Sequence, residues 1–183
     1  MPGTFTGVAV GAVAALPLAA LAVWVLAGLR RGAGVAPALA WRRSLAEVGI
    51  VYGTVPWVWL ILLPGSTPDA ARRRVSLVPL QDLITVLTDD QVRAIGQVLG
   101  NLLVFAALGF LAPQRFAALA SVRRILVLAA CCSVLVEVAQ YVLNLDRVSS
   151  VDDVLLNTAG AGLAALASRR WWAVADPVPV GQN

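Results

Sequence analysis

Histidine and lysine are both absent from the 183-residue chain. Without histidine there is no Ser-His-Asp triad and no His-ligated metal, and without lysine there is no Walker lysine and no Schiff base. The two cysteines, Cys131 and Cys132, are adjacent. They therefore give no disulfide framework and too few ligands for a structural zinc. These absences exclude several common catalytic and metal-site chemistries.

Charge is also scarce, because only 13% of the residues are charged, against roughly 25% in an average soluble domain. Hydrophobic residues make up 60% of the chain, and the mean hydropathy is +0.83. A soluble domain of this size could not bury so much apolar surface. The composition therefore predicts a membrane protein, and its Ala, Val, Leu, Gly and Arg content is typical of a bacterium with a GC-rich genome. The formal net charge of +4 does not indicate nucleic-acid binding, since membrane topology itself requires positive loops.

Five apolar stretches approach the length of about 20 residues that crosses roughly 30 Å of hydrocarbon. They are residues 1–29, 48–68, 94–114, 121–145 and 154–168. The first has no preceding Arg or Lys and is too long for a signal-peptide core, so we expect it to be retained. The fifth is short: either its helix continues through Trp172, or Asp152 and Asp153 lie at the hydrocarbon boundary. The predicted fold class is an all-α, polytopic membrane bundle of five transmembrane helices.

Arginine placement predicts the orientation, because cytoplasmic loops carry an excess of positive charge. Nine of the 14 arginines fall after the first, third and fifth stretches: Arg30, Arg31, Arg42, Arg43, Arg115, Arg123, Arg124, Arg169 and Arg170. The other five are largely offset by aspartates. The N-terminus is therefore expected outside and the C-terminus inside.

The same pattern divides the chain into three parts. Residues 1–44 form the first helix and an Arg-rich cytoplasmic loop, residues 45–168 form a domain of four spans with an outer loop at 64–93, and residues 169–183 form a cytoplasmic tail that is expected to be disordered at its end. In the outer loop, Leu80, Leu83, Ile84 and Leu87 recur at helical spacing. This predicts either a short amphipathic helix on the outer leaflet or a segment packed on the bundle.

Polar side chains recur within the last three spans. An ionisable group at membrane depth costs roughly 2.5–3.5 kcal/mol, so it calls for a partner or a role. Helical periodicity places polar groups on one face of each span. They are Gln97 and Asn101 in the third span, Ser133, Glu137, Gln140, Tyr141 and Asn144 in the fourth, and Asp153 and Asn157 in the fifth, where Gly160 and Ala164 continue the same stripe. With the predicted orientation, all of these polar groups fall in the outer half of the membrane.

Two interpretations of this convergence stay open. In the first, Asn101, Glu137, Gln140, Arg147, Asp152, Asp153 and Asn157 line a polar pocket that opens to the outer leaflet. In the second, they form a buried structural network, in which Arg147 neutralises a carboxylate and the amides hold helices together. Asp152 would then serve as the N-cap or dipole partner of the last helix. No metal or other cofactor is predicted.

Small residues also recur every four positions, at Gly49 and Gly53 and at Gly96 and Gly100, for example. Such pairs allow close helix contact, and we expect packing within the bundle rather than dimerisation.

The residues above, in this order, resemble the VanZ-like family of bacterial membrane proteins over about residues 51–167. The third span reads GNLLVFAALGFLAP, with Asn101, Phe105, Gly109, Phe110 and Pro113 in the family's positions. Glu137 and Gln140, then Arg147, then Asp152, Asp153, Asn157 and Gly160 continue the series. Ala107 stands where a proline is usual, and the Asn and the aromatic residue of a patch before the third span are missing.

The resemblance implies a multipass protein of the bacterial plasma membrane, and the family's namesake is linked to teicoplanin resistance. One hypothesis is a non-enzymatic envelope protein that binds a lipid-linked cell-wall precursor or a lipoglycopeptide. The alternative is an intramembrane enzyme that modifies such a precursor through its carboxylates, with Mg²⁺ as a cofactor under that alternative alone. A proton-coupled transporter is a weaker third idea, because nothing comparable lines the inner half. The expected partners are the lipid bilayer and such an amphiphile, without nucleic acid.

Overall fold

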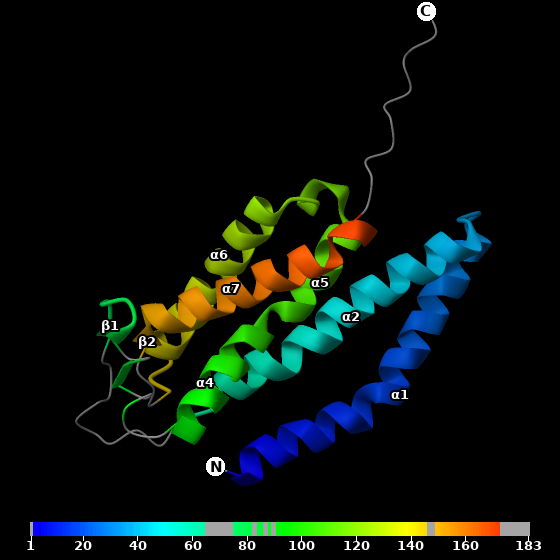
Figure 1. Cartoon of the computed structure of the whole chain (residues 1–183). Coiled ribbons are helices and arrows are strands. Elements are labelled where there is room, and N and C mark those ends of the chain that lie inside the picture. Colours follow the sequence, from blue (N-terminus) through cyan, green and yellow to red (C-terminus); the bar gives the residue numbers. More distant parts are fainter. Residues whose placement is uncertain are drawn as a thin grey trace, which may run out of the picture.

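The computed structural model describes residues 2–64, 75–81, 84–85, 88, 91–145 and 149–172. Figure 1 shows these residues as an elongated bundle of helices that alternate in direction. The start of α1 lies toward the end that carries the two short strands, and α7 ends at the opposite end. The described helices and strands are α1 Pro2–Gly32, α2 Pro37–Ile61, β1 Val75–Ser76, α4 Gln91–Val104, α5 Ala106–Arg115, α6 Val122–Val142, β2 Ser149–Ser150 and α7 Val151–Ser168, with 3₁₀ turns at Ala117–Leu119 and Arg169–Trp171.

Four helical segments are long and apolar enough to cross a membrane. They are Thr6–Gly32, Pro37–Ile61, Ala94–Arg115 and Val122–Val142. Together they confirm an all-α, helical membrane protein. The predicted fifth span corresponds to α7, which has 18 residues and is not among the four. Asp152, Asp153 and Asn157 lower its hydropathy.

The helix α2 begins at Pro37, well before the expected start at residue 48. Proline suits the first turn of a helix, because its fixed φ is already helical and its missing N–H has no partner there. Arg42 and Arg43, which were expected in a loop, therefore lie on the helix. The turn from α1 is short, and Gly34 adopts φ +84° within it, a conformation that glycine reaches without strain.

The third predicted span is two helices rather than one. Phe105 separates α4 from α5, with φ −113° and ψ 15°. The Phe105 side chain is buried in the core, and its carbonyl accepts a hydrogen bond from Gly109 N at 2.9 Å, so α5 begins directly after the break. Neither proline nor glycine stands at this break.

The helix α7 lies at the centre of the bundle, and α4, α5 and α6 all pack against it. Two glycines make this packing close. A Cβ at Gly160 would lie 2.0 Å from Leu102 O of α4, and a Cβ at Gly109 would lie 2.1 Å from Ala161 O of α7. Gly49 and Gly53 likewise face α5, as expected, whereas Gly96 and Gly100 face open space. At the edge of the bundle, α1 packs on α2 (Figure 1).

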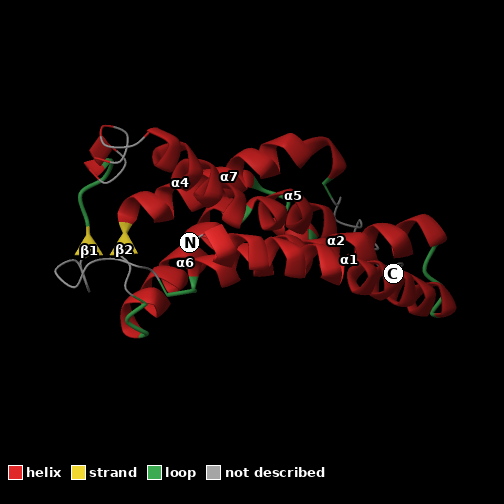
Figure 2. Ribbon diagram, turned by 90° about the horizontal axis from the view of Figure 1, so that it is seen from below, coloured by secondary structure: helices red, strands yellow, loops and turns green. Residues whose placement is uncertain are grey.

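The strands β1 and β2 form a parallel pair that the sequence analysis did not predict. Val75 pairs with Ser149, and Ser76 pairs with Ser150 (Figure 2). Two-residue strands are too short to produce a periodic signal in the sequence. The pair joins the segment between α2 and α4 to the start of α7. Part of the predicted outer helix is seen, since Ile84 and Thr85 are helical, but Leu83 and Leu87 lie outside the described residues.

Candidate functional site

Polar side chains of α4, α6 and α7 meet at the end of the bundle that carries β1 and β2. The polar cluster, as we name it, consists of Gln97, Asn101, Ser133, Glu137, Ser149, Ser150, Asp152, Asp153 and Asn157. It contains five of the seven predicted site residues. Three of its nine members lie on α7 and two more on the strand β2 directly before it, because that helix is central to the fold.

Asp153 joins α7 to α4. Its Oδ1 accepts hydrogen bonds from Asn101 Nδ2 at 2.5 Å and from Gln97 Nε2 at 3.4 Å. The two amides are four residues apart, so they occupy one face of α4, as the periodicity predicts. A carboxylate at this depth is thus held by amide donors from the neighbouring helix.

Glu137 joins α6 to the strand β2. Its Oε2 accepts a hydrogen bond from Ser150 N at 3.1 Å, and Ser149 Oγ donates to its backbone carbonyl at 3.3 Å. The Glu137 side chain is half-buried. A carboxylate that accepts backbone N–H bonds is held in one position, and here it fixes the entry into α7.

Asp152 joins α7 to the segment between α2 and α4. Its side chain is 2% exposed, and its Oδ1 accepts a hydrogen bond from Leu80 N at 2.5 Å. Asp152 was expected as a possible N-cap. The N-cap is instead Ser150, whose Oγ accepts from Asp152 N at 3.2 Å. A serine one residue before the helix suits this role, while Asp152 in the first turn complements the helix dipole.

Substitution of Asp152 by alanine is expected to release Leu80 from the start of α7. A hydrogen bond to a charged group contributes about 1.5–3 kcal/mol, so Leu80 should leave the start of α7 far more often. Limited trypsin digestion of the purified protein checks this, because Arg72, Arg73 and Arg74 precede Leu80 by six to eight residues in the sequence. Thr88→Ala, which removes an exposed hydroxyl from the segment between α2 and α4, is the control. Equal cleavage rates in the two variants would show that the hydrogen bond from Leu80 N to Asp152 does not hold Leu80 at the start of α7.

Asn157 lies deeper on α7, one helical turn beyond Asp153. Its side chain is 1% exposed, and its Nδ2 donates to Ser133 Oγ of α6 at 2.8 Å. Its Oδ1 has no hydrogen-bond partner among the described residues. A buried amide oxygen is costly to leave without a donor, so this oxygen is able to accept a further hydrogen bond.

Two predicted members of the polar face on α6 lie elsewhere. Gln140 is buried, but its Nε2 donates to Ile61 O at the end of α2, at 2.7 Å, so it ties α6 to α2. Tyr141 is 46% exposed and does not face the bundle. The polar face of α6 that joins the polar cluster is narrower than expected, because neighbouring helices cover only one side of α6. Arg147, which was expected to close the group, lies outside the described residues.

A Mg²⁺ site would need several oxygen ligands together. Within the described part of the chain, no group of three or more His, Cys, Asp or Glu side chains could hold a metal ion. The carboxylates of the polar cluster accept N–H donors instead.

A second charged group lies at the opposite end and was missed by sequence reasoning. Glu47 of α2 accepts from Arg30 Nη2 of α1 and from Arg115 Nε of α5, and Ser44 Oγ accepts from Arg30 Nη1 at 2.5 Å. Glu47 fell just outside the apolar stretch that begins at residue 48. One signal could have found it: it is the first acidic residue in the chain and follows four arginines, Arg30, Arg31, Arg42 and Arg43. These ion pairs fasten three helices together.

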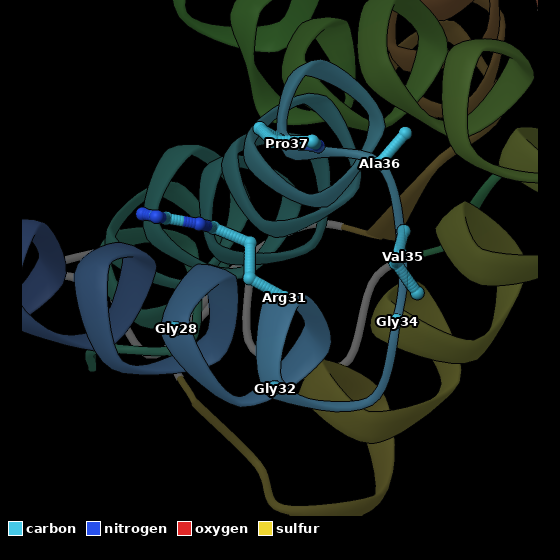
Figure 3. Close-up of a pocket in the computed structure, with 7 residues that line it drawn as sticks. All are labelled: Gly28, Arg31, Gly32, Gly34, Val35, Ala36 and Pro37. Atoms are coloured by element: carbon cyan, nitrogen blue, oxygen red, sulfur yellow. The ribbon is translucent and has the colours of Figure 1, made fainter.

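The turn between α1 and α2 also borders an open, shallow hollow of about 630 Å³ (Figure 3). It is lined by Gly28, Arg31, Gly32, Gly34, Val35, Ala36 and Pro37. Arg31 is its charged lining residue, and the hollow lies at the end opposite to the polar cluster.

No curated protein and no solved structure matches the chain. The model of one protein family, described as VanZ/LLP1, matches residues 50–172. The match covers well over half of the 183 residues and contains all the helices that form the polar cluster, while α1 lies outside it. The chain therefore belongs to the VanZ/LLP1 family, as its sequence resemblance predicted.

Proposed function

We propose that this chain is a five-span protein of the bacterial plasma membrane whose polar cluster binds an amphiphilic envelope ligand. The ligand class is a lipid-linked cell-wall precursor or a lipoglycopeptide such as teicoplanin, and binding alters sensitivity to that antibiotic. The ligand class follows from the family resemblance. The site follows from the residues of the polar cluster.

One observation favours a binding site over a purely structural network. The buried Oδ1 of Asn157 lacks a donor within the described residues, whereas Asp153, directly above it on α7, is held by two amides. A ligand hydroxyl or amide N–H that enters beside Asp153 would donate a hydrogen bond to Asn157 Oδ1. Amphiphiles combine such polar groups with an apolar tail, which suits a polar site flanked by apolar helices.

The proposed topology rests on the direction of the helices. Since α7 packs along α4, α5 and α6, it lies at the same depth as two segments that can span a membrane. The alternating helices bring the ends that carry Arg30, Arg43, Arg115, Arg123 and Arg169 to one end of the bundle. The positive-inside rule assigns this end to the cytoplasm, and the polar cluster then faces the exterior.

Replacement of Asn157 by leucine tests the proposal. Leucine has a similar size and removes the unpaired oxygen, and Ser133 Oγ can turn to a carbonyl of its own helix, so stability should be unchanged or higher. In a teicoplanin-sensitive host that expresses the protein, the variant should lose the whole change in inhibitory concentration that the wild type confers. Glu137→Gln and Asp153→Asn, which remove charge at nearly constant shape, should act in the same direction.

Membrane levels of each variant are measured by immunoblot, and Arg124→Gln at the opposite end is the matched control. If Asn157→Leu, Glu137→Gln and Asp153→Asn all keep the wild-type inhibitory concentration at equal protein levels, the proposed function is wrong. A reporter fused after Asn183 that is active only outside the cytoplasm would overturn the topology.

A further inference from the structure

A long apolar groove runs between α1 and α2. Its volume is about 870 Å³, within the range of roughly 300–1,000 Å³ that is usual for ligand sites. From α1 it is lined mostly by small residues, including Gly11, Ala15, Ala19 and Ala22, and from α2 by larger ones, including Val51, Tyr52 and Trp59. On α1 the lining runs from Gly7 to Leu26, about two thirds of the helix, and at about 1.5 Å per residue this length covers most of the depth of a membrane.

The groove is open because α1 and α2 touch each other without filling the space beside the small residues of α1. Tyr52 Oη donates to Ala12 O at 2.7 Å and so joins the two helices, yet a Cβ at Gly7 or Gly11 would meet nothing within 4 Å. Small residues normally allow helices to approach closely. Along this stripe of α1, the space that they leave is unfilled by the described side chains.

Positive charge gathers at one end of the groove. Glu47 lines that end and is paired with Arg30 and Arg115. Arg43 lies one helical turn before Glu47, is half-buried, and has no ion-pair partner among the described residues. Arg42 beside it is exposed and is equally without one. Four arginines and one carboxylate thus lie near this end of the groove, which therefore retains a net positive charge.

We propose that the groove binds an anionic glycerophospholipid, with its phosphate near Arg43 and one acyl chain along Ala22, Ala19 and Ala15. Basic pockets between membrane helices on the cytoplasmic side recognise anionic lipid headgroups. An acyl chain suits the lining, which is apolar beyond Glu47. This site lies at the other end of the bundle from the polar cluster and does not depend on the proposed function.

Native mass spectrometry of the full chain tests this lipid site. The purified protein is offered equal amounts of phosphatidylglycerol and phosphatidylcholine with identical acyl chains, and the bound lipid is counted. Phosphatidylglycerol should predominate on the wild type. Ala19→Phe, which fills the groove, should lose most of it, whereas Ala20→Phe, on the neighbouring exposed position outside the lining, should retain it.

The headgroup contact is tested separately. Arg43→Gln should bind phosphatidylglycerol about fivefold more weakly, the effect of one arginine near an anionic headgroup, and Arg123→Gln on α6 should bind it as the wild type does. Equal binding of the two lipids, or undiminished binding by Ala19→Phe, would overturn the proposal. A lipid-free dimer that Ala19→Phe disrupts would instead assign the groove to a second copy of the chain, and would overturn it too.

Discussion

Replacement of Gly160 by alanine is expected to prevent the native packing of α7 against α4. The new Cβ would lie 2.0 Å from Leu102 O, a backbone atom that no rotamer change can move aside. Overpacking in a core typically costs about 1–3 kcal/mol, and here the helices themselves must separate, so we expect at least about 3 kcal/mol. The loss would appear as a large drop in melting temperature in detergent, with little monodisperse protein.

A matched substitution separates this clash from a general effect of helical glycines. A Cβ at Gly96 of α4 would meet nothing within 4 Å, and alanine has the higher helix propensity, so Gly96→Ala should be as stable as the wild type. Gly109→Ala should behave like Gly160→Ala, because its Cβ would lie 2.1 Å from Ala161 O at the contact of α5 with α7. Equal stability of Gly96→Ala and Gly160→Ala would contradict the close approach of the helices.

Replacement of Glu47 by leucine is expected to destabilise the Arg-rich end of the bundle by about 2 kcal/mol. Removal of one partner from a fully buried pair costs about 3–5 kcal/mol, and the partial exposure of the arginine side chains, 21% for Arg30 and 25% for Arg115, lowers this value. Because Glu47 holds α1 as well as α5, hydrogen exchange in α1 should accelerate most. Exchange measured in detergent, together with the melting temperature, checks both effects.

The ion pair between Glu47 and Arg115 predicts how a double substitution affects stability. Adding Arg115→Leu to Glu47→Leu should cost less than the sum of the two single changes, since one uncompensated charge is then removed. Ser44→Ala, which deletes only the hydroxyl that accepts from Arg30, should cost about 1 kcal/mol. Strict additivity of Glu47→Leu and Arg115→Leu would mean that the ion pair contributes nothing to stability.

Long apolar stretches and the helical period of the polar residues made much of this structure predictable. Asn101 and Asp153 meet as expected because one residue occupies the inward face of α4 and the other that of α7. Glu137 likewise occupies a face of α6 that meets the segment before α7, where its carboxylate accepts from Ser150 N. These contacts depend on which face of a helix a residue occupies, and the 3.6-residue period specifies that face.

Other features depend on contacts between distant segments, which no local pattern encodes. The pairing of β1 with β2 joins segments of two residues each, and Leu80 N finds Asp152 across 72 positions of sequence. The bond from Gln140 to Ile61 O likewise required the position of α2 relative to α6. The break at Phe105 lacks the proline or glycine by which kinks are usually recognised. The early start of α2 was hidden by Arg42 and Arg43, whose long stems can follow an apolar helix while their charged heads reach water.

The helix α1 lies at the periphery of the molecule and packs on α2, whereas α4, α5 and α6 pack on α7. These helices around α7 lie within the VanZ/LLP1 match, and α1 lies outside it. A different first helix could therefore pack on α2 without changing the packing of α4, α5 and α6 on α7. Glu47 is the contact that such a helix would have to match, and an arginine at the position of Arg30 is the minimal requirement.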